Sequence, residues 1–435
     1  MKLARTFRVA MIAALVAVAC APTTTPSAAP TTLSASAAAD LRFTLWSGAE
    51  AHLKMFNDIA TAYRQTHPNV TVKFDVIPFE DYISKLTLQL SGGSAPDAGW
   101  LVETSAPTFV GAGVLQDLGP TVKQAAGYDF ADLSSSAMQL WQKGEAVYGV
   151  PFSNSPFFIL YNRDLFESAG VETPTQLLAK GQWTWEAFAR AAKGIVAKAP
   201  KGTYGFESID AGVFGSRVWH NLIPIIRGYG GDAWDAAGKR CLLNTSESVA
   251  AVKLFHGMVF TDRSTPAPGE QADFYSGKAA MTIAQLSRLT KLDSATFKWD
   301  IAPLPKGPAA DAQIVGQAAI VAFNASRNKA AAADFVAFLT NKENTAKLAA
   351  FFPPARTSVL TSDVMAKANP KVTPERLQQT VVQGIAKGTV LPAHAEFPKI
   401  DLAARGAFDK LWTANADVQT ALNGVCSAIG PILAQ

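Results

Sequence analysis

Residues 41–77, LRFTLWSGAEAHLKMFNDIATAYRQTHPNVTVKFDVI, decide the fold class of this chain. Residues 41–46 are typical of a strand, and residues 51–67 carry apolar side chains at helical spacing until Pro68 ends the pattern. Residues 71–77 then alternate apolar and polar side chains, which predicts a second strand. Strand–helix–strand units of this length predict a mostly parallel sheet with helices on both faces. The sequence therefore predicts an α/β fold.

The same alternation of elements continues along the chain. Further strands are expected at 98–102 and 157–161, and further helices at 82–90, 185–198 (with Thr184 as the N-cap), 248–260, 330–340 and 344–351. The body from Asp40 to Gln435 is long for one compact domain and fits two. No internal repeat is evident.

The N-terminal segment predicts export. Residues 1–8 carry three basic side chains, residues 9–19 are entirely apolar, and small residues lead up to Cys20. The segment 1–20 resembles a lipoprotein signal peptide ending at Cys20, which would be acylated; a secretion signal cut near Ala19 or Ala21 is the alternative. Residues 21–40 consist almost entirely of Ala, Pro, Thr and Ser, which predicts a flexible tether to the outer face of the cytoplasmic membrane.

Composition excludes several classes of function. The formal net charge is +4, and three of those charges lie in the signal segment, so no basic stripe remains for nucleic acid. The five His show no metal-ligand spacing, and no phosphate-binding or dinucleotide-binding glycine motif or G-x-S-x-G motif occurs, so no metal, cofactor or catalytic residue is predicted. Ser326 and Lys329 fit S-x-x-K without its companion motifs, and they are interpreted as the start of a helix.

Two cysteines remain after Cys20. In an oxidising compartment Cys241 and Cys426 can form a disulfide. Two buried free thiols are the alternative, because the sequence does not show whether their Cα atoms approach within about 7 Å.

Several short motifs occur in an order and spacing that resemble a known family. They include Phe43–Trp46, Ala95-Pro96-Asp97, Gly113–Leu118, Tyr148–Pro151, Leu160–Phe166, Trp183–Glu186, Tyr204–Phe206, Phe274–Met281, Asn324–Asn328 and Pro353–Arg356. Across nearly the whole mature chain they resemble the family 1 extracellular solute-binding proteins, the receptors of ABC importers for sugars and related polar solutes.

The resemblance implies a two-lobed periplasmic-binding-protein-like fold with the ligand cleft between the lobes. Three hinge crossovers would lie near residues 151–155, 279–283 and 323–328. Lobe one would comprise residues 41–152 plus 282–324, and lobe two residues 153–281 plus 325–435. Cys241 and Cys426 would both fall in lobe two, so a disulfide there would not block closure.

Candidate ligand-binding residues lie mainly at expected cleft positions. Aromatic rings stack on the apolar face of a sugar, and planar polar side chains reach its adjacent hydroxyls. Ligands of doubly wound sheets bind beyond the carboxyl ends of the strands. Two groups therefore follow the first and third strands, and the others follow from the crossovers or the family pattern: Trp46, Ser47 and Glu50; Glu103, Thr104 and Ser105; Asn154; Trp219, Tyr229 and Gly230; Gln285, Gln317 and Arg356.

Each of these candidates also has a purely structural interpretation. Aromatic residues usually pack in the core, Asn154 can satisfy a hinge, and Arg356 can form an ion pair. Asp97 is expected to cap local backbone, and Trp183 and Trp185 to pack the helix that they begin.

The leading functional hypothesis is a monomeric, non-enzymatic receptor, tethered to the membrane, that captures a sugar or oligosaccharide by hinge closure and docks on the membrane subunits of an ABC importer. A glycerophosphodiester or phosphorylated polyol is the alternative ligand, for which Arg217, Arg227 and Arg356 are available. Two other hypotheses remain. One is an exported glycoside-active enzyme that uses a carboxylate pair such as Glu145 and Glu186, and the other is a passive surface protein.

Overall fold

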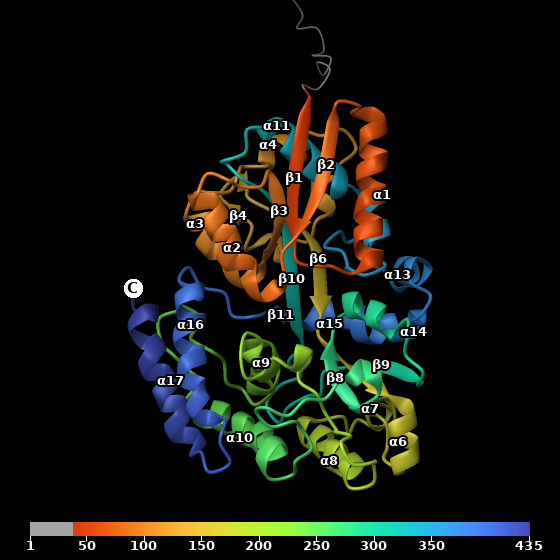
Figure 1. Ribbon diagram of the computed structural model, residues 1–435, viewed down its shortest axis with the longest axis vertical. Helices are drawn as coiled ribbons and strands as arrows, with labels where there is room; N and C mark the ends of the chain where they lie inside the picture. Colours follow the sequence, from red (N-terminus) through yellow and green to blue (C-terminus); the bar gives the residue numbers. More distant parts are fainter. Residues whose placement is uncertain (1–37) are drawn as a thin grey trace, which may run out of the picture. The chain divides into compact units, whose positions relative to one another are not determined.

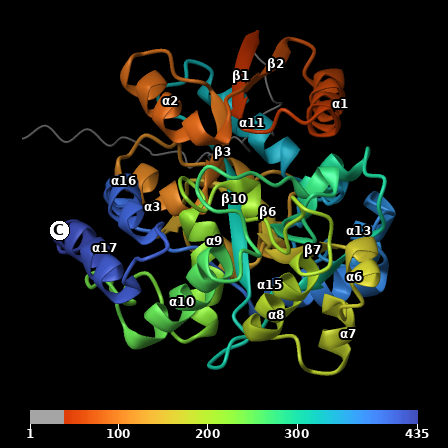
Figure 2. The ribbon, with the colours of Figure 1, turned by 60° about the horizontal axis from the view of Figure 1, so that its bottom comes forward.

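The computed structural model describes residues 38–435, so the predicted signal peptide, Cys20 and most of the tether lie outside the described residues. Within the described range, no helix is both long enough and apolar enough to cross a membrane. Two groups of strands organise this part of the chain, one around β1 (Ala39–Leu45; Figure 1) and one around β7 (Phe158–Asn162; Figure 2).

The first group is a six-stranded mixed sheet. Its order is β11-β10-β3-β1-β2, and a further strand, β6, pairs with β10. β1 is parallel to β2 and β3, whereas β10 is antiparallel to β3 and β6. The backbones of β1 and β3 approach so closely that a Cβ at Gly99 would lie 2.6 Å from Thr44 Cγ2. The bounds are β2 Val70–Val76, β3 Ala98–Val102, β6 Val150–Pro156, β10 Ile314–Ala322 and β11 Thr389–Val390.

Helices cover this sheet because each buries one apolar face against it. α1 (Glu50–Thr66) buries His52, Phe56, Ile59 and Tyr63, close to the predicted helix at 51–67. Phe43 of β1 lies in edge-to-face contact with Phe335 of α11, with ring centroids 6.2 Å apart. The other elements around this core are α2 Phe79–Ser91, α3 Ala106–Gly111, α4 Gly119–Val122, α5 Ser135–Met138, β4 Gln142–Lys143, β5 Ala146–Val147, α11 Lys329–Leu339 and α12 Lys342–Leu348.

The second group is a three-stranded antiparallel sheet of order β8-β7-β9. Side chains of β7 alternate between two hydrophobic clusters, with Ile159 and Tyr161 in one and Phe158 and Leu160 in the other. The two strands beside β7 are β8 Met281–Ala284 and β9 Trp299–Pro303. The helices around this sheet are α6 Arg163–Ala169, α7 Pro174–Ala179, α8 Trp185–Val196, α9 Val218–Gly228, α10 Ser246–Phe260, α13 Ser362–Ala368, α14 Pro374–Leu377, α15 Gln383–Lys387, α16 Phe397–Phe408 and α17 Val418–Leu433.

Several local predictions are confirmed in this second group. Thr184 caps α8 by accepting a hydrogen bond from the Ala187 N–H. Cys241 and Cys426 form a disulfide, so they are paired and are not two free thiols. Trp185 is buried in the adjoining core.

The chain passes between the two groups along β6 and β10. Val150 and Phe152 of β6 lie in the first core and Phe157 in the second, while β10 begins in the second core at Ile314 and ends in the first. Figures 1 and 2 show both strands connecting the two groups. The fold is therefore a two-lobed α/β fold, with these strands joining the lobes.

The distribution of segments between the cores differs from the predicted lobe bounds. β8 and β9, predicted to belong to lobe one, pair with β7 in the second sheet, whereas α11, predicted to belong to lobe two, packs in the first core. Strand pairing with β7 holds β8 and β9 in the second sheet, and aromatic packing against Phe43 holds α11 in the first core. We propose that the crossings lie near 150–157, 314–318 and 352–359, and that 318–355 completes the first lobe.

Candidate ligand-binding site

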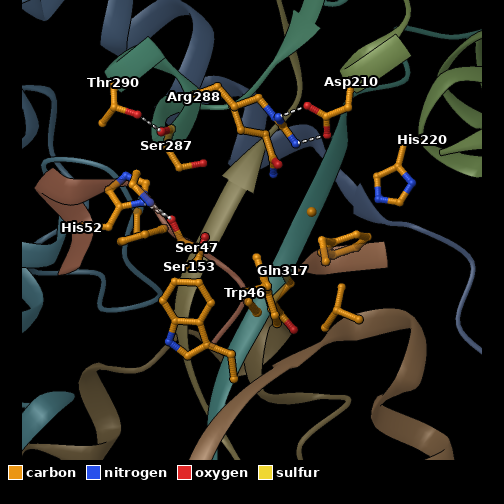
Figure 3. A pocket seen from close by; sticks show the side chains of 18 of the residues that line it. Trp46, Ser47, His52, Ser153, Asp210, His220, Ser287, Arg288, Thr290 and Gln317 are labelled. Atoms are coloured by element: carbon orange, nitrogen blue, oxygen red, sulfur yellow. Dashed lines mark hydrogen bonds and ion pairs between the residues drawn. The ribbon is translucent and has the colours of Figure 1, made fainter. Parts of the chain in front are cut away.

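A cavity of about 340 Å³ lies between the two lobes. The first lobe contributes the carboxyl ends of β1 and β3, the start of α1 and the start of α2. The second lobe contributes Asp210, the first turns of α9 and the 3₁₀ segment Leu286–Leu292, while β6 and β10 form the floor. Figure 3 shows Trp46, Ser47 and His52 on one side and Asp210, His220 and Arg288 on the other.

The wall formed by the first lobe (the first-lobe wall) is aromatic. The Trp46 ring lies 4.8 Å from that of Trp100 and 5.7 Å from that of Phe79, both in edge-on geometry. Trp100 in turn contacts Phe152, with centroids 4.9 Å apart. Trp100 and Phe152 are buried while Trp46 stays half-exposed, so Trp46 has a rigid aromatic support and a free surface for a ligand.

Next to Trp46, two polar side chains form a neutral pair. The Ser47 hydroxyl and His52 Nδ1 are 2.7 Å apart. Burial lowers the pKa of His52 to about 4, so its ring is neutral at physiological pH. A hydrogen bond with the Ser287 backbone of the opposite lobe opposes this lowering, and the His52 ring lines the cavity.

Glu103 is the buried acid of the first-lobe wall. Its Oε2 accepts a hydrogen bond from the Gln317 N–H at 3.0 Å, and its Oε1 has no partner among the described residues. Burial raises the pKa of Glu103 to about 8, despite the hydrogen bond from Gln317 and the charge of Arg217. At neutral pH this carboxyl is therefore mainly protonated and can donate a hydrogen bond to a ligand.

The floor of the cavity is held by amide side chains. Gln285 Nε2 donates to the Ser155 carbonyl at 2.9 Å, and the Gln317 side chain accepts from Trp141 Nε1 at 2.6 Å. Gly316 is required here, because a Cβ would lie 2.6 Å from Gln285 Nε2 and 2.9 Å from the Phe157 ring. These amides are already engaged, so they fix the shape of the floor.

The wall formed by the second lobe (the second-lobe wall) is a network of charges. Asp210, in the left-handed backbone region at φ 53°, accepts hydrogen bonds from both terminal nitrogens of Arg288 and pairs with Arg217 at 3.0 Å. Lys291 Nζ lies 3.6 Å from the same carboxylate. Burial would raise the pKa of Asp210, but the three cations outweigh it and lower the pKa to about 2.

Arg217 also contacts the opposite lobe. Its guanidinium lies 3.6 Å from the centroid of the Phe79 ring, and Nη1 is 3.2 Å from His220 Nε2. Burial, and then the neighbouring charges of Arg217 and Arg288, hold the pKa of His220 well below its usual value. The neutral His220 ring stacks on Phe157, with centroids 5.8 Å apart.

Five predicted site residues converge on this cavity: Trp46, Ser47, Glu103, Gln285 and Gln317. Three others line a neighbouring groove of about 850 Å³ between α2 and α16, namely Thr104, Ser105 and Trp219. Asn154 is buried beneath the floor, where its Oδ1 accepts from Gln317 Nε2 at 3.3 Å. Glu50 is exposed at the start of α1 and does not line the cavity.

The remaining candidates are engaged elsewhere. Arg356, 1% exposed, donates to the carbonyls of Thr340 and Asp129 and stacks on Tyr128, because the core closes over it. Tyr229 donates to Glu186 at 2.5 Å, and neither it nor Gly230 lines the cavity. Arg356 and Tyr229 are therefore engaged within the protein, and none of the three residues lines this cavity.

Four further residues with a predicted or possible role lie outside the cavity. Asp97 accepts from the Arg42 N–H and from the Ser326 hydroxyl, as expected for a residue that caps local backbone and loops. Arg227 is bound to Asp232 and to the Val390 carbonyl. Glu145 is fully exposed and pairs with Lys123, and neither it nor Glu186 lines the cavity, so the carboxylate pair has no support.

The sequence did not point to His52, Phe79, Asp210, His220 or Arg288 as site residues. They are scattered over five segments without a common motif, and only the fold brings them together at the cavity. Arg288 carried one usable signal, because it lies three residues after Gln285 on the same 3₁₀ segment. No group of three or more potential metal ligands occurs in residues 38–435.

Comparison with known proteins matches residues 51–346 to the bacterial extracellular solute-binding proteins. A Brucella abortus protein named as a binding protein is 26% identical over 308 residues, 67% of this chain and 70% of its own length. An arabinooligosaccharide-binding protein of Halalkalibacterium halodurans is 23% identical, covering 67% of this chain and 66% of that protein. A Streptomyces antibioticus lipoprotein is 24% identical, covering 67% of this chain and 64% of that protein.

Solved structures agree with the fold. An ABC substrate-binding protein from Listeria monocytogenes in complex with cycloalternan aligns with a TM-score of 0.78 at 23% identity, covering 90% of this chain and 98% of that one. UgpB from Mycobacterium tuberculosis in complex with glycerophosphocholine aligns with a TM-score of 0.78 at 20% identity, covering 91% and 98%. Since the family match spans more than half of its length, the chain belongs to the bacterial extracellular solute-binding proteins.

Proposed function

We propose that this protein is the extracytoplasmic receptor of an ABC importer and captures a sugar or oligosaccharide between its two lobes. The observation that carries the proposal is the cavity itself, in which the half-exposed Trp46 faces polar groups of the opposite lobe. An aromatic surface and convergent hydrogen-bonding groups are what a pyranose requires. The relatives and solved structures that bind oligosaccharides support the same assignment.

Hinge closure supplies the signal of occupancy in this proposal. The lobes are joined through β6 and β10, and the cavity is lined from both lobes, so a ligand contacts both walls only in the closed state. A ligand shifts such an equilibrium by the difference between its affinities for the two states. The closed, liganded receptor then docks as a monomer on the membrane subunits of the importer and does not itself catalyse a reaction.

The site of action follows from the N-terminal sequence. We propose that Cys20 is acylated and that residues 21–38 tether the receptor to the outer face of the cytoplasmic membrane, since the predicted tether of 21–40 loses its last two residues to β1. A Streptomyces antibioticus relative named as a lipoprotein supports this part of the proposal.

A glycerophosphodiester or phosphorylated polyol is the second candidate ligand. Arg217 and Arg288 at the cavity favour it, because guanidinium groups match phosphate oxygens. The solved structure with glycerophosphocholine supports its inclusion.

A thermal-shift screen against neutral sugars, oligosaccharides, polyols and glycerophosphodiesters tests the proposal. A ligand at about 100 times its dissociation constant stabilises the folded state by about 2.7 kcal/mol, which raises the melting temperature measurably. Recovery of the ligand unchanged separates a receptor from an enzyme. If no compound raises the melting temperature of protein freed from co-purified ligand, the sugar assignment is wrong.

A further inference from the structure

We propose that the ligand carries an anionic group, a carboxylate or a phosphate, that binds at the second-lobe wall beside Arg217, Arg288 and Lys291. The inference rests on the proposed function, because it names the class of ligand for the same cavity. An acidic sugar and a phosphodiester share this chemistry.

The charges lining the cavity do not balance. Three cations, Arg217, Arg288 and Lys291, surround it, and the acidic residues among its lining are Asp210 and Glu103. Burial raises the pKa of Glu103 to about 8, so it carries little charge at pH 7. Asp210 is then the charged acid of this lining, and it is bonded to all three cations. Glu207 and Asp273 share a second, adjoining cavity with Arg288 and Lys291, outside the lining of the first.

The guanidinium groups of Arg217 and Arg288 repel each other, and burial removes the water that would otherwise screen their charges. Burial, and next the charge of Arg288, lower the pKa of Arg217 to about 10 even though Asp210 opposes the change. Glu80 also acts on Arg217, but it is exposed at the start of α2, where water screens its charge. An additional anion in the cavity would relieve this repulsion.

Unused donors also remain in the second-lobe wall. Arg217 Nε and Arg288 Nε are buried without a hydrogen-bond partner among the described residues. The Arg217 side chain is only 9% exposed, so water does not readily replace a missing partner. Carboxylate and phosphate oxygens are the acceptors that suit a guanidinium fork.

A neutral ligand satisfies this wall less well. Its hydroxyls can accept hydrogen bonds, but closure around it would leave excess positive charge away from water, which is costly. An anionic ligand gains that stabilisation only when the lobes close, because Arg217 meets Phe79 of the opposite lobe. The excess charge therefore favours closure on acidic ligands.

Titration calorimetry of the full-length protein with matched ligands tests the inference. Each sugar or oligosaccharide skeleton is supplied as the neutral sugar, the uronate, the uronate methyl ester and the phosphate, together with glycerophosphocholine. We expect the acidic form of the preferred skeleton to bind at least about tenfold more tightly than its neutral and esterified forms, as for one charge-assisted hydrogen bond. The uronate and phosphate arms distinguish the two sources of the anion.

Two substitutions locate the anionic group. R288Q should reduce the preference for the acidic form about tenfold, and K291Q, at a half-exposed position, about twofold to threefold. R240Q, which removes an exposed arginine beside Asp235 away from the cavity, is the matched control and should leave the preference unchanged. If Arg288 acted only in folding, R288Q would weaken the binding of neutral and acidic ligands equally.

The outcomes separate the two proposals. Tighter binding of a neutral sugar or methyl ester than of its acidic form overturns the inference and leaves the sugar receptor standing. An acidic preference that neither R288Q nor K291Q reduces also overturns it. Failure of every compound to bind removes the proposed function together with the inference.

Discussion

The two walls of the cavity are built from different interactions. The first-lobe wall is a set of interlocked aromatic rings around Trp46 and Trp100, with an acid whose pKa is raised. The second-lobe wall is an ion network around Asp210, whose pKa is lowered. Packing fixes the first wall through close contacts, whereas the second depends on charges that an incoming ligand can rearrange. We therefore expect substitutions in the first wall to affect mainly stability, and those in the second to affect selectivity.

Trp100→Ala should have the largest effect. Trp100 is 1% exposed and contacts Trp46, Phe152 and Phe352, so truncation leaves a cavity in the first core. We expect a loss of about 3–5 kcal/mol in the free energy of unfolding, measured by urea denaturation. Leu402→Ala, at a side chain that is 70% exposed, is the control and should change it by less than about 0.5 kcal/mol. Equal effects of both substitutions would contradict the packed first wall.

Removing the disulfide should have the next largest effect, and it should spare both walls. Cys241 and Cys426 are 185 residues apart in sequence, and both pack against the same second-lobe core. The double substitution C241S/C426S should lower the free energy of unfolding by about 2–4 kcal/mol. Ligand affinity at 25 °C should stay within about twofold, because neither residue lines the cavity. A large loss of affinity would show that the wall depends on this cross-link.

The sequence predicted the fold in most of its local detail. β3 lies at the predicted residues 98–102, and Thr184 caps α8, because apolar periodicity and capping are local signals. The assignment of segments to lobes could not be predicted as well. It depends on the pairing of β8 and β9 with β7 and on the packing of Phe335 against Phe43, contacts between residues far apart in the chain.

Prediction of the site was limited in the same way. Trp46 and Glu103 follow β1 and β3 directly, so a rule about strand ends finds them. Asp210 and Arg288 lie on 3₁₀ segments without a motif, and their pairing appears only in three dimensions. Arg356 shows the converse, since a charged residue after two prolines suggests exposure, yet this side chain is buried in a hydrogen-bond network.

The response to pH should distinguish the two acids. The pKa of Glu103 is raised to about 8, so the folded state holds a proton that the unfolded state has lost, and stability should fall as pH rises from 4.5 to 8. The pKa of Asp210 is lowered to about 2, so its contribution is present above pH 3.8 and lost as pH falls toward 2. Urea denaturation across pH 3–9 measures both.

Replacing each acid by its amide shows which acid causes which change of the free energy of unfolding with pH. Between pH 4.5 and 8, E103Q should remove a decrease of about 1.4 kcal/mol per pH unit in the free energy of unfolding. D210N should leave the pH dependence in this range unchanged. D210N should instead flatten the loss of stability below pH 4. A wild-type stability that rises steadily from pH 5 to pH 8 would contradict the raised pKa of Glu103.

The contact that joins the two walls should give the smallest effect. Phe79 of the first lobe lies under the Arg217 guanidinium of the second, 3.6 Å from ring centroid to Cζ. Phe79→Leu keeps an apolar side chain but removes the ring face, and the lost cation–π interaction is worth about 1 kcal/mol. We expect about fivefold weaker binding of acidic and neutral ligands alike, because the contact stabilises the closed state and not one ligand. Phe79→Tyr should restore affinity, and Leu88→Ala on the same helix, at a 69% exposed position, should leave it unchanged. Equal losses for F79L and F79Y would mean that the two walls meet through the fit of Phe79 alone and not through charge.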